Sequence, residues 1–429
     1  MKTYFKPNKE KWDELIQRPL INNRDITTSV SSILLEVKQK GDQAIIDFAK
    51  RFDNVTLDAI EVSNSEIQNA VSSISQELKD AIEVAYHNIY NFHKAQQREE
   101  AAVETSNGVK CWRKSVPIDK VGLYIPGGTA PLFSTILMLA IPAKIAGCKE
   151  IVLCTPPSKS QTINPAILYA AQRVGVTKIF KVGGAQAVGA LTYGTETIPK
   201  VYKIFGPGNQ YVTKAKELVQ QEGVAIDMPA GPSEVLVIAD KTCNPIFVAA
   251  DLLSQAEHGV DSQVILLSND KETTDDCLNQ VALQLEKLPR KETAKKALEN
   301  SKAIIFDNIE KCIELSNIYA PEHLIIASDN ATEYVDGITN AGSVFIGNYS
   351  CESAGDYASG TNHTLPTNGF AKNYSGVSLD SFVKKITYQQ LSREGIKNIG
   401  SSIEIMAEAE QLFAHKNAVT VRLNFITNG

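Results

Sequence analysis

The sequence lacks the cysteine patterns that mark a disulfide framework or a cysteine zinc site. Its 429 residues include seven cysteines, and no two of them form a C-x-x-C pair. An odd number of scattered cysteines is typical of small buried apolar side chains in a reduced protein. Neither a disulfide scaffold nor a cysteine zinc site is indicated.

Long apolar segments and an excess of positive charge are absent too. The most apolar window, residues 133–147, is interrupted by Pro142 and Lys144 and is too short to span a bilayer. The N-terminal residues hold no uninterrupted apolar stretch of the kind found in secretory signals. The net charge of −6 argues against a nucleic-acid partner, which requires a basic surface. We therefore expect a cytoplasmic protein with neither nucleic-acid nor membrane partners.

The sequence does contain short apolar runs that alternate with helical patterns. The runs that we interpret as strands are VGLYIP (121–126), EIVLCTP (150–156), KIFKVGG (178–184), EVLVIAD (234–240), QVILLS (263–268), AIIFDN (303–308), HLIIAS (323–328) and SVFIG (343–347). Helical patterns separate some of them, at 131–147, 164–174 and 209–222. This alternation predicts an α/β fold whose parallel sheets are covered on both faces. A chain of 429 residues exceeds the size of a single core, so two or more domains are expected.

Both ends of the chain are predicted to be mainly helical. Apolar residues recur at three- and four-residue spacing over about 28–97, and Ser63 with Glu66 has the spacing of a capping box that opens a long second helix. His87 and His93 fall on that helix without a partner at ligand spacing, so we interpret them as surface or packing residues. Beyond Gly376 the pattern is mainly helical and ends in the strand-like segment AVTVRLNF.

Three glycine-rich segments each precede a helical pattern. They are IPGGTAP (125–131), KVGGAQAVGA (181–190) and FGPGN (205–209). Such segments can bring backbone N–H groups to an anionic ligand, but they can also be simple tight turns. The dinucleotide fingerprint GxGxxG is absent. Three such loops on one predicted sheet favour a ligand-binding edge over three unrelated turns.

Candidate chemical groups gather in the second half of the chain. They share imidazole, amide or carboxylate side chains: Gln255, His258, Glu322, His323, Asp356, His363, Glu410 and His415. Gln255 and His258 stand three residues apart at the end of a predicted helix, so both can point at one ion. Helix capping and an Asx turn in the small-residue loop around Asp356 are structural explanations that stay open. The residue types suit a catalytic metal centre, although no compact motif such as HExxH is present.

Longer segments of the chain resemble one known family. LYIPGGTAPLFSTILMLAIPA, GGAQAVGALTYGTE, KIFGPGN, AIDMPAGPSEVLVIAD, DLLSQAEHG, YAPEHLII, AGSVFIG, ESAGDYASGTNHTLPT and AHKNAVTVRLN are similar to signature segments of the histidinol dehydrogenases. The similarity runs in order from about Val121 to Leu423 and is looser over the N-terminal helices. Blocks of this length exclude a chance likeness. The resemblance implies oxidation of L-histidinol through L-histidinal to L-histidine, the last step of histidine biosynthesis, with reduction of two NAD+.

The resemblance also implies roles for individual residues. The implied ligands of one zinc ion per subunit are Gln255, His258, Asp356 and His415. The implied acid–base pair is Glu322 and His323. The implied substrate contacts are Ser233, Gln255, His258, His323, Asp356, His363, Glu410 and His415. The implied NAD contacts, in the three glycine-rich segments, are Tyr124, Gln186 and Asn209.

For the architecture, the resemblance implies two incomplete Rossmann-like domains and a small, mainly helical C-terminal segment. Residues 1–20 and 115–235 are expected to form the first domain, with the NAD-contacting loops. Residues 21–114 and 236–373 are expected to form the second, with the metal site. Residues 374–429 are expected to cross to the partner subunit of a homodimer, so that Glu410 and His415 complete the neighbour's site.

The chemistry gives the paired residues separate tasks. An alcohol proton must leave as hydride goes to NAD+, which suits the imidazole of His323 as a base. The aldehyde must be hydrated before it loses a second hydride, and Glu322 can activate that water. Adjacent side chains on an extended backbone face opposite ways, so 321–323 is expected to form a non-extended turn.

Three other functions compete with this one. A related zinc- and NAD-dependent dehydrogenase of another small polyol or amino alcohol is disfavoured by Glu410 and His363, which are placed for a charged amine and an imidazole. A zinc hydrolase that uses Glu322 to activate water leaves the glycine-rich segments without a role. A non-catalytic metal-dependent scaffold does not require the Glu322–His323 pair.

Overall fold

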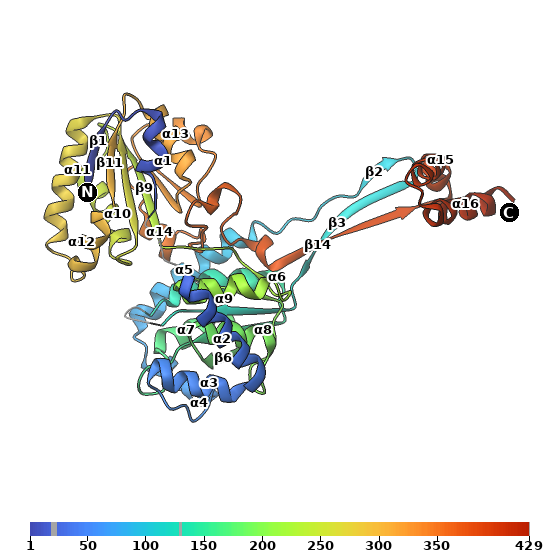
Figure 1. The fold of residues 1–429 in the computed structure, drawn as a ribbon, viewed down its shortest axis with the longest axis horizontal. Coiled ribbons are helices and arrows are strands. Elements are labelled where there is room, and N and C mark those ends of the chain that lie inside the picture. Colours follow the sequence, from blue (N-terminus) through green and yellow to red (C-terminus); the bar gives the residue numbers. More distant parts are fainter. Residues whose placement is uncertain (19–23, 128–130, 429) are drawn as a thin grey trace. The chain divides into compact units, whose positions relative to one another are not determined.

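The computed structural model describes residues 1–18, 24–127 and 131–428. The chain forms two compact units, of which the first consists of Met1–Gln96 with Ile118–Phe382 and the second of Gln97–Pro117 with Val383–Gly429. The first unit contains two parallel sheets with helices on their faces (Figure 1). Among the described residues, no helix combines the length and apolarity needed to cross a bilayer.

The first sheet has five parallel strands in the order β6-β5-β4-β7-β8. Its strands are β4 Lys120–Tyr124, β5 Glu150–Thr155, β6 Lys178–Lys181, β7 Lys203–Phe205 and β8 Ala225–Ile226. The helices that belong with it are α2 Arg24–Lys40, α3 Asp42–Phe48, α4 Asn64–Ser73, α5 Gln76–Lys94, α6 Phe133–Ala146, α7 Pro165–Val174, α8 Gly184–Tyr193 and α9 Gln210–Gln220. A five-residue π-helical segment, Ala49–Asp53, follows α3. The predicted helices at 131–147, 164–174 and 209–222 are confirmed as α6, α7 and α9.

Helices cover both faces of this sheet because its strand residues are apolar on both sides. Ile151 and Leu153 of β5 join a core with α5, α6 and α7. The alternate residues Val152 and Cys154 join a second core with α2, α3, α8 and α9. Continuous apolar runs are what parallel strands buried on both faces require.

The second sheet has six parallel strands in the order β1-β11-β10-β9-β12-β13. Its strands are β1 Lys2–Phe5, β9 Glu234–Ala239, β10 Gln263–Ser268, β11 Lys302–Ile305, β12 His323–Ala327 and β13 Ser343–Ile346. Its helices are α1 Trp12–Leu15, α10 Pro245–Ala256, α11 Lys271–Leu285, α12 Lys291–Glu299, α13 Ile309–Tyr319 and α14 Glu352–Tyr357. Short 3-10 turns lie at Lys9–Lys11, Ala331–Gly337, Phe370–Lys372 and Leu379–Phe382. All eight predicted strands are therefore present in the two sheets.

The N-terminal segments belong to the opposite sheets from those predicted. Strand β1, within the segment 1–20, pairs with β11 of the second sheet. Helices α2 to α5, within the segment 21–114, pack on the first sheet. Strand β1 is mostly exposed and takes its place through backbone pairing with β11, about 300 residues away, which no local sequence pattern reveals. The predicted boundary at residues 20 and 21 lies outside the described residues.

The predicted N-terminal helical region contains helices α2 to α5, but breaks separate them, including a non-helical stretch at 54–63. Ser63 and Glu66 form the predicted capping box at the start of α4. The predicted long helix is two helices, because Ser75 caps a new start at α5. His93 is buried and hydrogen-bonded to the carbonyl of Ile89 at 2.8 Å, which confirms a packing role.

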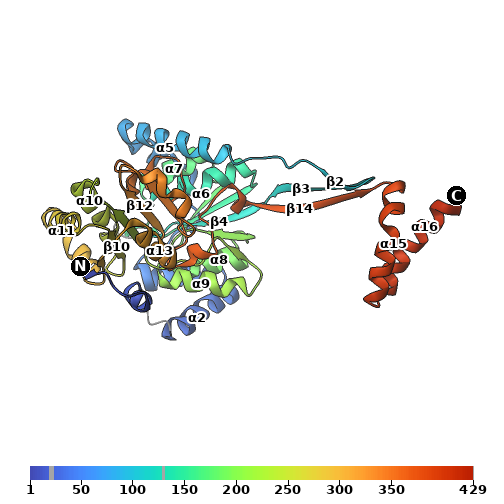
Figure 2. The ribbon, with the colours of Figure 1, turned by 90° about the horizontal axis from the view of Figure 1, so that it is seen from above.

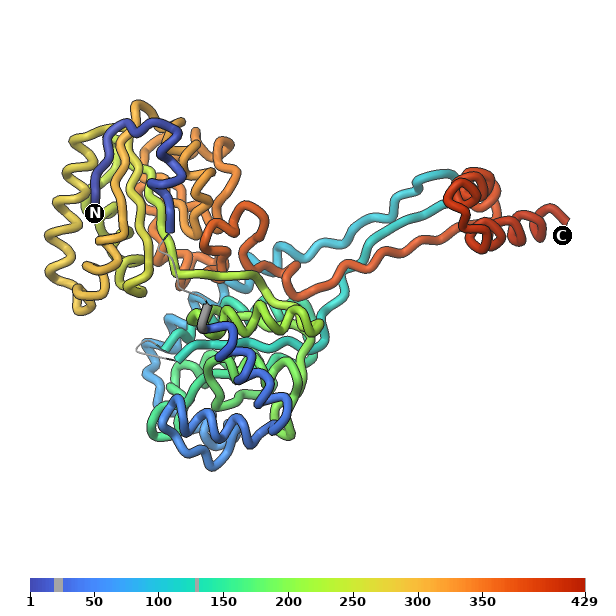
Figure 3. The backbone as a smooth tube through the Cα atoms, in the orientation of Figure 1, coloured from blue at the N-terminus to red at the C-terminus, as the bar shows by residue number. Residues whose placement is uncertain are grey.

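The second unit pairs an antiparallel sheet with two helices (Figures 2 and 3). Its sheet has the order β14-β3-β2, from β2 Val103–Ser106, β3 Val109–Pro117 and β14 Val383–Leu391. Its helices are α15 Arg393–Ala409 and α16 Phe413–Asn428, which pack on one another. The prediction of a strand-like tail is wrong, since AVTVRLNF lies within α16. A β-branched run does not prevent a helix that has a packing partner.

Gly206, in the third glycine-rich segment, packs closely against strand β4, and Gly223, outside the segment, serves as a comparison. Gly206 (φ 124°) and Gly223 (φ 89°) both have a backbone that disfavours side chains, but only at Gly206 would a Cβ collide with the carbonyl oxygen of Tyr124. We expect Gly223→Ala to lower the free energy of unfolding by about 1 kcal/mol and Gly206→Ala by about 2–4 kcal/mol. Denaturant titration of both variants measures the two losses in the free energy of unfolding. Equal losses would show that a Cβ at Gly206 does not collide with the carbonyl of Tyr124.

Candidate active site

Two acid–base side chains meet at the start of parallel strands β9 and β12. The structure aligns His323 with Val235, so the main chain of Glu234 runs beside the residues that open β12. The backbone N–H of Glu234 donates to Glu322 Oε2 at 2.9 Å, and its carbonyl lies 3.1 Å from His323 Nδ1. Glu322 lies at a bend just before the strand, as the predicted non-extended turn requires. The bend lets two adjacent side chains reach one residue.

The hydrogen bond to Glu234 fixes the chemistry of the His323 ring. A carbonyl oxygen only accepts, so Nδ1 carries the proton in this contact and Nε2 keeps a lone pair in the neutral ring. Nε2 is buried and has no hydrogen-bond partner within the described structure. His323 is 4% exposed, so water does not satisfy this atom freely. Such an orphaned nitrogen is suited to take a proton from a bound ligand.

Carboxylates surround this imidazole. His323 Nδ1 lies 3.7 Å from Glu322 Oε2 and 3.8 Å from Glu352 Oε1, and Nε2 lies 3.7 Å from Asp356 Oδ1. Burial lowers the pKa of His323, but the charges of Glu352, Glu322 and Asp356 outweigh it and raise the pKa to about 10. Burial raises the pKa of Glu322 to about 7. The site has more negative than positive charge and would favour a cation.

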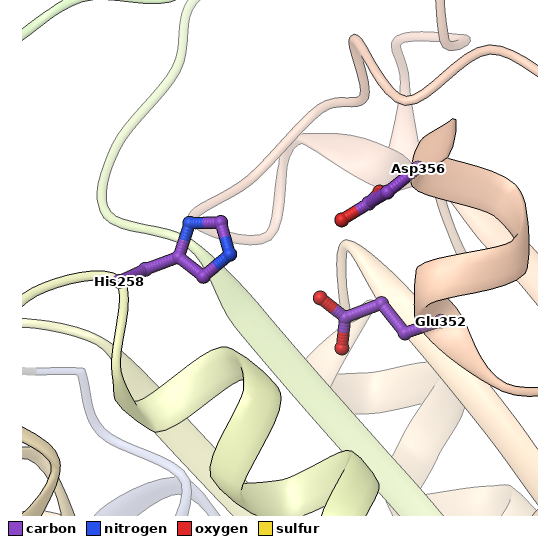
Figure 4. A group of neighbouring side chains, drawn as sticks. All are labelled: His258, Glu352 and Asp356. Atoms are coloured by element: carbon purple, nitrogen blue, oxygen red, sulfur yellow. The ribbon is translucent and has the colours of Figure 1, made fainter. Parts of the chain in front are cut away.

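Three side chains converge at a position suited to such a cation. Ligand atoms of His258, Glu352 and Asp356 all lie within 4.8 Å of one another. Figure 4 shows the imidazole of His258 pointing toward the two carboxylates, which project from the same short helix. One imidazole with carboxylate oxygens is a donor set that divalent zinc accepts. The residues therefore fit a metal ion.

Local sequence explains how these ligands are presented. Asn244 caps α10 by accepting from the N–H of Ile246, with Pro245 at the first helical position. Gln255 is buried near the end of that helix, and His258 follows two residues after it ends at Ala256. The predicted proximity of Gln255 and His258 is present, although only Gln255 is helical.

Glu352 is a site residue that sequence reasoning missed. The loop predicted around Asp356 is helix α14, which puts Glu352 and Asp356 four residues apart on one face. The Gln255 amide meets Glu352 with its nitrogen, which donates to both Oε1 and Oε2 of that side chain. This contact leaves the amide oxygen of Gln255 available as a ligand. The i, i+4 carboxylates in ESAGD were the available signal.

His363 joins the loop after α14 to helix α6. Its Nδ1 lies 2.8 Å from the carbonyl of Asp356, and its Nε2 lies 3.1 Å from the hydroxyl of Thr135. The neighbouring Asn362 donates to the carbonyl of Met138 at 2.6 Å. His363, the predicted substrate contact, is thus held in place by the carbonyl of Asp356 and by helix α6.

The other predicted substrate and metal residues lie in two places. Ser233 is half-buried and directly precedes β9, next to Glu234. Glu410 directly follows α15 as its C-cap and His415 lies in α16, so both belong to the second unit. Their roles stay predictions.

The three predicted NAD contacts line one cavity of the first unit. This cavity has a volume of about 1270 Å³, and its lining includes Tyr124, Gln186 and Asn209. They lie at the carboxyl end of β4 and in the segments that follow β6 and β7, where open α/β sheets bind ligands. Residues 128–130 of the first glycine-rich segment lie outside the described residues.

Two of these three side chains, Tyr124 and Asn209, also have a local structural role. The hydroxyl of Tyr124 accepts from the N–H of Gly184 at 3.1 Å, and burial raises the pKa of Tyr124 to about 12. Asn209 caps α9 by accepting from the N–H groups of Tyr211 and Val212 at 3.0 and 3.2 Å. Gln186 is buried in α8. A residue can cap a helix and line a cavity at the same time, so these local contacts neither support nor oppose NAD binding. The role of the three residues in binding NAD stays a prediction.

Comparison with known proteins gives one consistent result. The family model described as histidinol dehydrogenase matches residues 16–423. Histidinol dehydrogenase of Bacteroides thetaiotaomicron is 60% identical over 424 residues, which covers 99% of this chain and 99% of that protein. Histidinol dehydrogenase of Escherichia coli (strain K12) is 54% identical over 418 residues, 97% of this chain and 95% of that protein. The crystal structure of histidinol dehydrogenase from Elizabethkingia anophelis has a TM-score of 0.98 and 60% identity, and covers 100% of this chain and 99% of that chain.

The position of Glu352 yields a prediction about metal affinity. Because Glu352 contacts Gln255 and lies beside His258 and Asp356, we expect Glu352→Ala to weaken zinc binding by about 10- to 100-fold. To measure the zinc affinity, metal-free protein prepared with a chelator competes with a zinc-sensitive dye for added zinc. Glu272→Ala, a change at an exposed glutamate of α11, is the control and should leave it unchanged. Wild-type affinity in Glu352→Ala would remove Glu352 from the site.

Proposed function

The chain belongs to the histidinol dehydrogenase family, and we propose that it oxidises L-histidinol through L-histidinal to L-histidine in the cytoplasm, with reduction of two NAD+. The observation that carries this proposal is the buried His323, whose unpartnered Nε2 faces Asp356 at 3.7 Å. Alcohol oxidation requires a base that accepts the hydroxyl proton, and this nitrogen can do so in the neutral ring, which positive charge from a bound metal ion would favour. The two relatives described above, 60% and 54% identical over nearly the whole chain, are both histidinol dehydrogenases, so another polyol or amino alcohol is not favoured as substrate.

We propose that Gln255, His258 and Asp356 hold a zinc ion, with His415 as a further ligand. The converging atoms of His258, Glu352 and Asp356 support this set. Bound zinc would supply Lewis acidity, a template for an amino alcohol that carries an imidazole, and compensation for the surrounding carboxylates. Ser233, His363 and Glu410 would contact the substrate.

His323 would act as the general base for the alcohol step. Its Nδ1 is tied to the carbonyl of Glu234, which holds the ring in one orientation and leaves Nε2 to accept the hydroxyl proton. Positive charge beside Asp356 and Glu352 would offset the carboxylates that raise the pKa of His323. The ring would then be neutral when the substrate proton must leave.

Glu322 would serve the aldehyde step. Its carboxylate is buried, and burial raises its pKa to about 7, in the range where a carboxyl group can exchange protons near neutrality. The N–H of Glu234 donates to Oε2 and holds the group beside His323. A water taken up by L-histidinal would give its proton to Glu322, and the hydrate would then lose the second hydride.

NAD+ would bind in the cavity lined by Tyr124, Gln186 and Asn209. A volume of about 1270 Å³ is large enough for a dinucleotide, and glycine-rich segments let backbone N–H groups approach its phosphates. No GxGxxG segment is present, so these contacts would differ from the common dinucleotide fingerprint.

We propose further that the protein is a homodimer whose second units complete the partner's active sites. Large apolar side chains are exposed on α15 and α16, among them Met406 (65%) and Phe425 (71%). Exposed apolar residues on a small helical unit are typical of an interface. The exchange would bring Glu410 and His415 to the partner's site.

The proposed function predicts that two NADH form per histidinol, which absorbance at the nicotinamide band measures.

We expect His323→Asn to slow the alcohol step by about 10²–10⁴-fold, since the variant loses the general base. Glu322→Gln should impair oxidation of L-histidinal more than that of L-histidinol, because only the aldehyde needs an activated water.

Each half-reaction needs its own substrate and a control for folding. L-Histidinol and L-histidinal are supplied separately, and circular dichroism and zinc content are compared with the wild type. Equal damage by both variants to both steps would contradict the division of roles. No NADH from wild-type protein with either substrate would refute the proposed function itself.

The exchanged dimer predicts complementation between inactive variants. His258→Ala and His415→Ala proteins are unfolded together and reassembled. In a heterodimer, one site carries both defects and the other carries neither, so activity should return to about half of the wild type per heterodimer, by symmetry. Mass analysis counts the heterodimers. Heterodimers without activity would show that each site is built within one subunit.

A further inference from the structure

A buried ion pair lies behind the two acid–base residues and takes no part in the proposed chemistry. Arg18 and Glu234 form a two-point contact: Nη2 donates to Oε2 at 2.8 Å, and Nε donates to Oε1. Their side chains are 19% and 3% exposed. Because both charges are largely removed from water, the contact is fixed in direction and poorly screened.

The guanidinium of Arg18 is held from two further sides. Nη2 also donates to the carbonyl of Tyr319 at 2.9 Å, and the guanidinium carbon lies 3.9 Å from the centroid of the Tyr319 ring. The ring hydroxyl is itself bonded to Gln263 at 2.9 Å. Arg18 therefore connects Glu234, at the start of β9, to the residue that ends α13, three positions before Glu322.

The main chain of Glu234 is the only described partner that both acid–base side chains share through hydrogen bonds. Its N–H donates to Glu322, and its carbonyl receives the Nδ1 proton of His323. Its side chain also accepts from the N–H of Asn368 at 3.0 Å. A rotation of this one peptide segment would move the Glu322 carboxylate and the His323 ring together.

We propose that the Arg18–Glu234 pair is a positioning device that sets the orientation of Glu322 and His323 through the main chain of residue 234. The inference rests on the proposed function, because it assigns the pair to that reaction. Neither side chain is among the groups proposed to contact the substrate, so both would act through Glu322 and His323. A buried ion pair seldom adds stability over apolar residues of similar size, which makes placement of the catalytic groups a better reason for it than stability.

The chain contains a matched pair at a distance from these residues. Arg173 makes a two-point contact with Glu83, with Nη2 at 2.7 Å from Oε2, and its guanidinium carbon lies 3.7 Å from the centroid of the Tyr86 ring. This pair joins α7 to α5, and its side chains are 30% and 33% exposed. It copies the chemistry of the first pair without contact to Glu322 or His323.

The experiment separates placement from stability. In the full-length holoenzyme, Arg18→Met leaves Glu234 as an unpaired buried charge and should lower both Tm and kcat. The double variant Arg18→Met/Glu234→Gln removes that charge and should recover most of the lost Tm. If the pair positions the acid–base residues, kcat of the double variant stays about 10- to 100-fold low for both half-reactions, with KM for NAD+ and zinc content unchanged.

The Arg173–Glu83 pair supplies the control variant. Arg173→Met should lower Tm without changing kcat. If kcat of the double variant returns to the wild-type value as Tm recovers, or if Arg173→Met lowers kcat as much as Arg18→Met, the positioning role is overturned. Wild-type protein that does not oxidise histidinol would refute the proposed function, whereas active wild type with active Arg18 variants refutes only this inference.

Discussion

The alignment of strand β9 with strand β12 is the constraint on which the site depends. With His323 level with Val235, one residue of β9 faces both side chains of the acid–base pair. A shift of the register by one residue would turn both to other partners. The second sheet thus presents its chemistry where strands begin, whereas Tyr124 closes β4 of the first sheet at a carboxyl end. The cavity that Tyr124 lines and the Glu322–His323 pair therefore lie at opposite kinds of strand end.

Much of this arrangement was accessible from the sequence, because the relevant signals are local. Continuous apolar runs marked the strands, since both faces of each sheet are covered by helices. Glycine-rich segments after strands marked the cavity edge that holds Tyr124, Gln186 and Asn209. Long segments of similarity identified the family, and the candidate zinc, substrate and NAD residues were inferred from the family resemblance. Composition and spacing alone reached only a plausible metal site.

What the sequence did not reveal depends on contacts between distant segments. Glu352 became visible only when the expected loop proved to be helix α14, which places it against Gln255. Arg18 and Glu234 are 216 residues apart, and no periodicity connects them. Strand β1 was missed for the same reason, because it is exposed in pattern and takes its place from β11. The strand-like tail was misread because packing between α15 and α16 overrides β propensity.

The discontinuous second unit has a consequence for synthesis on the ribosome. Strand β3 pairs with β14, and the contact between Lys385 and Ser115 spans 270 residues of sequence. At about 5–20 residues per second, the β2–β3 hairpin would wait roughly 15–50 s for its third strand. During that time one edge of β3 is open to other nascent chains. The cationic side chains of Lys110 and Lys114 along this strand would repel a second copy of the same edge and leave it available for β14.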